Sequence, residues 1–435
     1  MSKILPVAIY LLLSLLYGFG QTPELNAEKY SIYRNNLSNH FIYCNGDAAV
    51  RGSYLPMESI RINRSNKSYA SWADAIWWQG HYIAMLATEY KLLKINGKNG
   101  DSVLKEIENA LDTYYRLDLA AEKCWGGSDS LNGFFLRDDI DPSMTDLFGV
   151  DFILSDYKAN CGDSSTIKNA PSQDQLWGSY LGFALVNKLV EDDTLKRKVG
   201  DITARLIKAM QHTDSNGKEV WEIVNPVTGK LIQKSGDIKW MQYAHAQAGI
   251  YLSGVDCNFG MSNSTLWKDI WDLLQNNLLI NKNGNFSWYG VMVCSAVINE
   301  YGRGSDNCYD WLVEQSDRIA KKRPDLQQTL IFPHLPLVAA VLHGYEGDNP
   351  LPASVYEDYL NSAPIEGAHN YTIEDSVFNS NPPWHSLSLF CPWHDHDNGK
   401  FNMLDYMLLY NLYQLTYKSE LPEFKYLWDQ NSNSN

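Results

Sequence analysis

The sequence lacks the short motifs that identify several large enzyme classes. It has no G-x-S-x-G nucleophile elbow, no phosphate-binding loop and no dinucleotide-binding glycine fingerprint. It also lacks a basic run: 36 Lys and Arg residues stand against 51 Asp and Glu residues, giving a formal net charge of −15. Because an acidic surface repels phosphate backbones, nucleic acid is not an expected partner.

Long apolar runs are equally scarce, and the one that could matter lies at the N-terminus. Lys3 precedes the apolar stretch LPVAIYLLLSLLYGFG, and small residues near its end suit cleavage near Gln21. We therefore expect residues 1–20 to be a signal peptide and the mature protein to be secreted or periplasmic, without membrane association. An uncleaved membrane anchor is the alternative.

Cysteine is sparse and odd in number. The seven cysteines begin at Cys44, so none directly follows the apolar run to take a lipid anchor. Export permits disulfides, and an odd count leaves at least one thiol unpaired within a monomer. Cys294 lies in an apolar helical stretch, where we expect it to be a buried small hydrophobe.

What the sequence does contain is a large apolar and aromatic fraction. Of its 435 residues 45% are hydrophobic, and 14 Trp and 27 Tyr are present. This composition predicts a sizeable folded core. It also suits a sugar-binding cleft, because flat rings stack on sugar faces.

From Trp72 onward the chain is a succession of paired helical patterns. Residues 74–97 form a long apolar pattern, residues 102–122 a more amphipathic one, and the alternation recurs along the chain. Because a helix that is apolar all round is buried and an amphipathic one faces water, the alternation predicts an inner and an outer layer. The inner helices are expected to begin near Ala75, Ser172, Asp237, Ser287, Phe332 and Phe401.

About six such pairs predict an all-α fold, a six-hairpin α/α toroid, with an open solenoid as the alternative. We expect the toroid to span residues 72–420 as the catalytic domain. Residues 21–71 are expected to pack on it and to supply the partner of the last inner helix, and residues 421–435 form a polar tail. One small β-hairpin in residues 214–233, with an Asn-Gly turn at Asn216, decorates one face.

One inner helix opens with polar residues although its body is apolar. Ser172 and Gln175 have the capping-box spacing, and Asp174 suits the positive end of the helix dipole. Gly178 and Gly182 share a helical side with Asp174, where they would let a neighbouring backbone approach closely.

Tryptophan recurs at or near the first turn of these helices. The residues concerned are Trp78, Trp177, Trp240 and Trp288. In a toroid the first turns of the inner helices face one cleft. The tryptophans are therefore expected to line a pocket whose floor carries Asp174.

The same stretch resembles a known family. Ser172, Gln175, Trp177 and Tyr180 match the spacing of the S-R-G-Q-x-W-x-x-Y stretch of unsaturated glucuronyl hydrolases, whereas the arginine and glycine of that stretch are Gln173 and Asp174 here. That family consists of six-hairpin α/α-toroid glycoside hydrolases that hydrate the double bond left by polysaccharide lyases, using an aspartate as general acid and base. The resemblance implies a carbohydrate-active toroid.

Two groups of carboxylates are candidates for acid–base chemistry. Asp174 lies beside apolar and indole surfaces, which can raise the pKa of a general acid; a helix-dipole partner is the alternative. In the insert FFLRDDIDP, Asp139 is the predicted catalytic partner of Asp174, with Arg137 and Asp138 beside it. A loop-stabilising salt bridge or a cation site is the alternative for this group. Asp141, before a proline, suits a turn.

Residues 363–400 are long for a loop and rich in Trp, His and Pro, which favours one wall of the same cleft. His385, Trp393 and His394 are candidate substrate contacts. Cys391, His394 and His396 could together ligate zinc, but no well-spaced ligand pair stands out, and we predict neither a metal nor another cofactor.

These patterns predict a secreted glycoside hydrolase that acts on a poly- or oligosaccharide through Asp174 and Asp139. A polysaccharide lyase is the nearest alternative, with Tyr289, His245 or His394 as base, and a non-catalytic glycan-binding protein is another. His81 and His245, inside inner helices, are more typical of hydrogen-bonded core histidines. The predicted substrate-binding residues are Trp78, Gln79, Arg137, Asp138, Gln175, Trp177, Trp240, Trp288, His385, Trp393 and His394.

Overall fold

A computed structural model describes most of the helical part of the chain. The described residues are 23–44, 46–63, 65–72, 74–125, 130–155, 170–213, 216–217, 219–225, 229, 231–234, 239–255, 284–301, 307–322, 330, 332–345, 351–365 and 398–417. For some residues within helices and strands only the backbone is described. The expected signal peptide and the polar tail lie outside the described residues.

The protein is mostly helical. Its longer helices are α2 (Pro23–Asn36), α3 (Ala75–Ile95), α4 (Asp101–Trp125), α6 (Gln173–Leu189), α7 (Asp193–Met210), α8 (Lys239–Ser253), α10 (Gly284–Ile298), α11 (Cys308–Lys322), α12 (His334–His343), α13 (Ala353–Ser362) and α14 (Leu404–Tyr417). Shorter turns are η1 (Leu37–Phe41), η2 (Pro142–Met144) and α5 (Thr145–Phe148).

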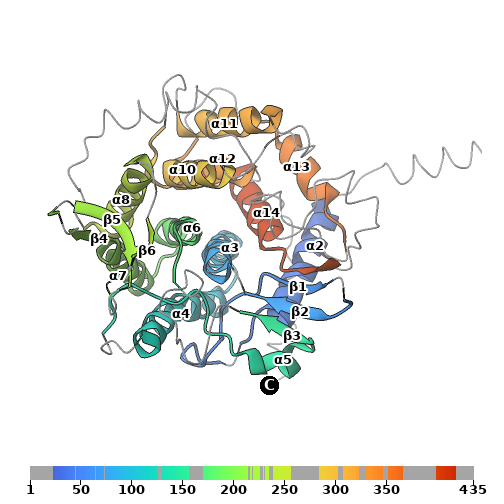
Figure 1. Ribbon diagram of the computed structural model, residues 1–435. Coiled ribbons are helices and arrows are strands. Elements are labelled where there is room, and N and C mark those ends of the chain that lie inside the picture. The colour runs from blue at the N-terminus through green and yellow to red at the C-terminus, as the bar shows by residue number, and fades with distance from the viewer. Residues whose placement is uncertain are drawn as a thin grey trace, which may run out of the picture.

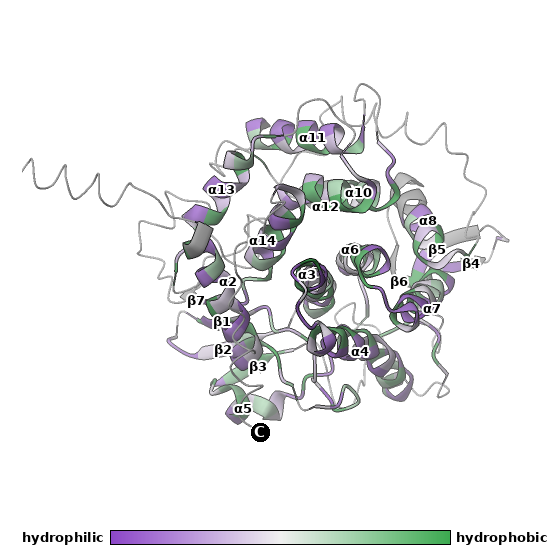
Figure 2. Cartoon of the chain, turned by 180° about the vertical axis from the view of Figure 1, so that it is seen from behind, coloured by the Kyte–Doolittle hydropathy of each residue, from purple (hydrophilic) through white to green (hydrophobic). Residues whose placement is uncertain are grey.

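The helices lie in two layers. In Figure 1, α3, α6, α10, α12 and α14 lie nearer the middle, and α2, α4, α7, α11 and α13 lie outside them. The difference in burial explains the layering: 18 of the 21 residues of α3 are buried, against 11 of the 25 residues of α4. Figure 2 shows the same contrast, with α10 and α12 mainly hydrophobic and α11 hydrophilic on its outer side.

The helices α3, α6, α8, α10, α12 and α14 run in the same direction, and together they form what we call the inner layer. Contacts at two levels support this for α3 with α6, for α6 with α8 and for α10 with α12. His334 and His343, at the two ends of α12, contact Tyr289 in the first half of α10 and Ala296 at its end, respectively. We call the end of the molecule at which these helices begin the start end, and the opposite end the far end.

The contact between α3 and α6 is unusually close because glycines face it. A Cβ atom on Gly80 would lie 2.0 Å from the backbone of Gly178, and one on Gly182 would lie 2.4 Å from the carbonyl oxygen of Gly80. A side chain at these positions would force the helices apart. The predicted close approach at Gly178 and Gly182 is therefore confirmed.

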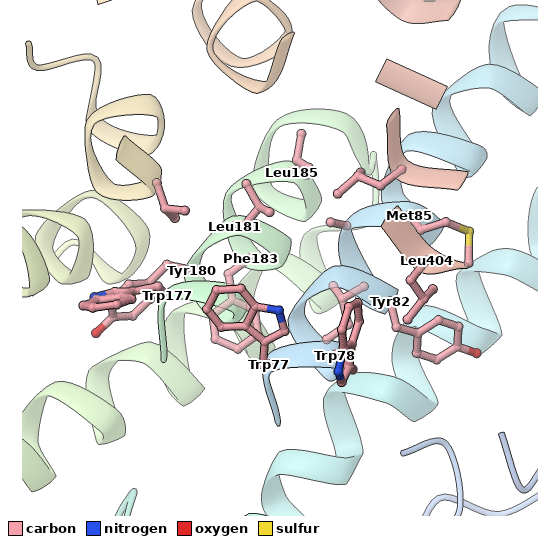
Figure 3. Packing of buried hydrophobic residues seen from close by; sticks show 14 of the residues in the cluster. Trp77, Trp78, Tyr82, Met85, Trp177, Tyr180, Leu181, Phe183, Leu185 and Leu404 are labelled. Atoms are coloured by element: carbon pink, nitrogen blue, oxygen red, sulfur yellow. The ribbon is translucent and has the colours of Figure 1, made fainter. Parts of the chain in front are cut away.

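Aromatic side chains fill the space around this contact. Figure 3 shows Trp77 and Trp78 of α3 and Trp177 of α6 near the starts of their helices, with Phe183 beside them. The ring of Trp177 in turn packs on α10, because a Cβ atom on Gly290 would lie 2.3 Å from the indole. The core is thus continuous from α3 through α6 to α10.

The N-terminal helix α2 packs against the last helix, α14, as the sequence predicts. Tyr33 and Tyr406 contact edge to face with ring centroids 4.8 Å apart, and the centroids of Tyr30 and Tyr410 are 5.2 Å apart. In Figure 1, α2 accordingly lies beside α14, although the two helices are far apart in the chain.

The structure has more β-structure than the single hairpin that the sequence predicts. The predicted hairpin is present as a three-stranded sheet of β4 (Gln211–Thr213), β5 (Glu219–Val224) and β6 (Leu231–Lys234). A second sheet has the order β3-β2-β1-β7, from β1 (Ser59–Ile62), β2 (Ser68–Ser71), β3 (Phe152–Leu154) and β7 (Asn398–Phe401). Strands β1 and β2 are neighbours in the chain, but β3 and β7 come from distant segments. Because all four strands have only three or four residues, no local pattern marks this sheet.

The predicted starts of the inner helices agree with the structure to within three residues. Strand β7 enters α14 through Asn402, whose side chain donates to the carbonyl of Met57 (3.0 Å). Since β7 pairs with β1, the segment before Trp72 is tied to the start end of α14.

Candidate active site at the start end of the inner layer

The first turns of several inner helices meet at the start end. The ring centroids of Trp77 on α3 and Tyr289 on α10 are 4.8 Å apart, and those of Tyr289 and Phe332, just before α12, are 4.7 Å apart. The side chains of His81, Tyr289 and His334, from three different helices, are buried together there. We call these three residues the His–Tyr–His array.

The hydrogen bonds of the array fix its protons. His81 Nδ1 lies 2.8 Å from the carbonyl oxygen of Trp77, which can only accept, so Nδ1 carries the proton. The Tyr289 hydroxyl then donates to His81 Nε2 at 3.0 Å. It accepts from Nε2 of His334 at 3.2 Å.

Burial keeps all three groups neutral. It lowers the pKa of His81 to about 4 and that of His334 well below its usual value, while it raises the pKa of Tyr289. Desolvation disfavours the charged form of each group. The array is therefore an uncharged chain of hydrogen bonds at neutral pH.

His245 on α8 forms a separate pair with Trp177. The indole N–H of Trp177 donates to His245 Nε2 at 3.1 Å, so this nitrogen is unprotonated, and Nδ1 lies 3.4 Å from the Tyr180 hydroxyl. Burial lowers the pKa of His245 to about 3. His245 is thus a hydrogen-bonded core histidine, the interpretation that the sequence favours.

Carboxyl groups also gather at the starts of inner helices. Asp74 precedes α3 and accepts from the Gln175 side chain at 3.5 Å. Asp174 lies in the first turn of α6, but its side chain is outside the described part of the structure. The predicted capping box is not formed: Ser172 is the N-cap residue, yet its hydroxyl makes no cap hydrogen bond, and the amide of Gln175 is directed to Asp74 instead.

Asp405, in the first turn of α14, is a carboxyl group that the sequence analysis missed. Its side chain is fully buried, and burial raises its pKa to about 7. Oδ1 accepts from the backbone N–H of Tyr406 at 2.9 Å, whereas Oδ2 has no hydrogen-bond partner among the described residues. A carboxylate at the start of an apolar helix was the available signal, the same one that drew attention to Asp174.

The structure separates the three charged residues of the insert. Arg137 Nε donates to the carbonyl oxygen of Ala170, just before α6, at 2.8 Å. Asp138 is buried and accepts from Ser155 Oγ at 2.5 Å. Of the three, Arg137 thus contacts the chain that enters α6.

Asp139 lies on the α4 side of the insert. Its carboxylate forms an ion pair with Arg116 at 2.8 Å and accepts from the backbone N–H of Gly52 at 3.1 Å. This is the loop-stabilising salt bridge that the sequence allows as the alternative to catalysis. Asp141 forms the expected turn and accepts from the Ser143 N–H at 2.9 Å.

Four predicted substrate-binding residues are buried in the protein core. Trp78 and Gln79 of α3 and Gln175 of α6 have no exposed surface, and Trp177 is 1% exposed. The Gln79 amide donates to the carbonyl oxygen of Ala110 at 2.7 Å. The close α3–α6 contact buries these side chains in the interior. They therefore pack below the surface of the start end and do not form an exposed wall of a cleft.

The remaining predicted contacts lie outside what the structure describes. For Trp240 and Trp288 only the helical backbone is described, and residues 366–397 are not described. That range contains His385, Trp393 and His394, and also the zinc alternative of Cys391 and His396.

Two further observations concern only the described residues. Among them, no group of three or more His, Cys, Asp and Glu side chains is placed to hold a metal ion. None of the helices in the described ranges is long and apolar enough to cross a membrane.

Both layers contain buried free thiols, and one cysteine of the outer layer is disulfide-bonded. Cys294 in α10 is a buried free thiol, as the sequence predicts, and Cys308 at the start of α11 is a second one. Cys124, near the end of α4, is disulfide-bonded.

Comparison of the chain with protein-family models, with curated proteins and with solved structures gave no match.

Proposed function

We propose that the protein is an exported glycoside hydrolase with the fold of a six-hairpin α/α toroid and an active site at the start end. The observation that carries the proposal is the convergence of the parallel inner helices, which gathers carboxyl, imidazole and phenol groups at that end. The parallel inner layer and the pairing of α2 with α14 support the toroid. The Cys124 disulfide supports export, because disulfides persist in oxidising compartments.

Asp174 is the proposed general acid and base. Its place in the first turn of α6 puts it at the positive end of a helix dipole, directly before Gln175, whose side chain contacts Asp74. Asp139, the other predicted catalytic carboxylate, is already held by Arg116 and Gly52. We therefore assign Asp139 the role of fixing the insert, and Arg137 that of holding the insert against the entrance to α6.

The charge state of the array favours hydrolysis over lysis. A lyase that uses Tyr289 as base needs a phenolate, and burial raises the pKa of Tyr289. Burial lowers the pKa of both neighbouring histidines, so neither imidazole supplies a cation that would offset that penalty. The array is therefore better suited to be a rigid, uncharged part of the start end than to be a catalytic base.

The experiment is incubation of the mature protein with a panel of polysaccharides, followed by two product assays. Hydrolysis releases new reducing ends without ultraviolet absorbance, whereas lysis of a uronate polymer also creates an absorbing unsaturated end. Products that absorb in the ultraviolet would show that the protein is a lyase and not a hydrolase. Tight binding without turnover of any polysaccharide in the panel would show that the protein is a non-catalytic glycan-binding protein.

Replacing Asp174 tests the assignment of the residue. Asp174→Asn should lower turnover roughly 10²–10⁴-fold, the usual contribution of a general acid or base, while the protein still folds. Asp193→Asn is the matched control, because Asp193 is an exposed carboxylate in the first turn of α7. Equal activity of the two variants would reduce Asp174 to a helix-dipole partner.

A further inference from the structure

A cavity of about 640 Å³ lies on the outer side of α4, away from the His–Tyr–His array. One wall is α4, from Lys105 to Lys123, and the opposite wall is the loop formed by residues 46–51. Asp139 of the insert also lines the cavity. We call this cavity the α4 groove.

The walls of the α4 groove are fixed by a buried ion pair. Arg116 of α4 donates to Asp139 at 2.8 Å and to the carbonyl oxygen of Ser53 at 2.8 Å, and also to the carbonyl oxygen of Ala48. The side chains of Arg116 and Asp139 are only 9% and 3% exposed. Because the loop, the helix and the insert share this pair, the groove is preformed rather than assembled by a ligand.

The chemistry of the lining suits a ligand rich in hydroxyl groups. Cationic side chains (Arg51, Lys123) and anionic ones (Asp47, Asp112) both line the groove, together with small or apolar side chains such as Leu119. Two of these charged groups already have partners outside the lining, because Arg51 pairs with Asp141 and Asp112 pairs with Lys198. Since neither sign of charge dominates, the groove offers no strong field for an ion. Sugar rings, which present hydroxyl edges and apolar faces, match an arrangement of this kind.

The direction of the groove links it to the proposed active site. The stretch of α4 between Lys105 and Lys123 is roughly 27 Å long at 1.5 Å per residue, and α4 runs from the far end to the start end. Asp139 in the groove is two residues from Arg137, which contacts the chain entering α6. A long polymer in the groove would therefore point toward the start end.

We propose that the α4 groove is a second saccharide-binding site, one that holds part of a neutral polysaccharide chain outside the site of bond cleavage. The choice of ligand class rests on the proposed function, whereas the groove and its lining do not.

The test uses the full mature protein and measures binding separately from turnover. Native gels containing xylan, galactomannan, mixed-linkage β-glucan or polygalacturonate report binding as retarded migration. The groove variant is Arg51→Ala combined with Lys123→Ala; both side chains are exposed, so the fold should survive. The control is Arg197→Ala combined with Lys208→Ala, which removes the same charge from exposed positions of α7.

We expect at least one neutral polysaccharide to retard the protein and the control, and the groove variant to bind it about tenfold more weakly, as for loss of one charged hydrogen bond. No retardation by any neutral polymer, or equal retardation of both variants, would overturn the proposal. Retardation by polygalacturonate alone would also overturn it, since the ligand would then be a polyanion.

Measuring turnover as well as binding distinguishes failure of the groove proposal from failure of the hydrolase proposal. If the groove binds but no products form, the second site stands and the hydrolase fails. If products form from polymer and from short oligosaccharides alike in both variants, the hydrolase stands and the groove fails.

Discussion

The two ends of α3 carry buried polar networks of opposite kinds. Near its start, His81 belongs to the uncharged His–Tyr–His array. Near its other end, Glu89 forms an ion pair with Arg34 of α2 at 3.1 Å, and Arg34 also contacts Glu106 of α4 at 2.5 Å.

The difference reflects what each network joins. The charged network at the far end links α2, α3 and α4. The neutral network at the start end links inner helices only. The far end is thus held together by fixed charges, whereas the start end is held together by hydrogen bonds between neutral groups.

The largest expected effect comes from breaking the charged network. Arg34→Met leaves the buried Glu89 without its cation, and removal of one partner from a buried ion pair typically costs about 3–5 kcal/mol. Chemical denaturation of the mature protein measures the free energy of unfolding. Arg197→Met, at an exposed position of α7, is the control and should change it by less than about 0.5 kcal/mol.

The second-largest expected effect is a dependence of the free energy of unfolding on pH, caused by Asp405 at the start end. The folded-state pKa of Asp405, about 7, lies above its ordinary value of 3.8. Its contribution to stability is therefore complete below pH 3.8 and is lost as the pH rises through 7. Asp405→Asn does not titrate, so the variant should gain stability relative to the wild type as the pH rises from 4 to 8, by up to about 4 kcal/mol.

Denaturation curves of both proteins at several pH values measure this gain. His81, whose folded pKa is lowered, loses stabilisation as the pH falls from 6.5 to 4, but it does so in both proteins and cancels in the difference. A difference that stays constant with pH would mean that Asp405 is not a buried proton carrier.

A smaller effect tests whether the array is a connected chain of hydrogen bonds. Tyr289→Phe removes the hydroxyl that donates to His81 and accepts from His334. Leaving buried polar atoms unpaired should cost about 1–3 kcal/mol. Tyr115→Phe, which removes a hydroxyl bonded to Asp201 on the outer surface, should cost less, and equal losses would argue against the array.

Sequence reasoning succeeded where the information is local. The inner helices begin where their apolar patterns begin, and the glycines of α6 lie at the α3 contact. It missed the β3-β2-β1-β7 sheet, because strand pairing between residues 59–62 and 398–401 depends on the whole fold. For the site, sequence reasoning noticed the carboxylate of Asp174 at a helix start but missed that of Asp405. The sequence around a helix start does not show whether a carboxylate there is buried.

The sequence also does not show which polar residue at a helix start forms a cap hydrogen bond. The smallest expected effect on stability tests this difference between two helices. At the start end, Ser172 precedes α6 but makes no cap hydrogen bond. At the far end, Asp192 precedes α7 and accepts from the N–H groups of Thr194 and Leu195 at 2.7 and 3.1 Å. A cap that is formed is worth about 0.5–2 kcal/mol. Asp192→Ala should therefore cost roughly 1 kcal/mol in a denaturation experiment, whereas Ser172→Ala should cost close to nothing. A loss of 1 kcal/mol or more at Ser172 would mean that the capping box does form, and that the first turn of α6 is closed by its own chain rather than available to a ligand.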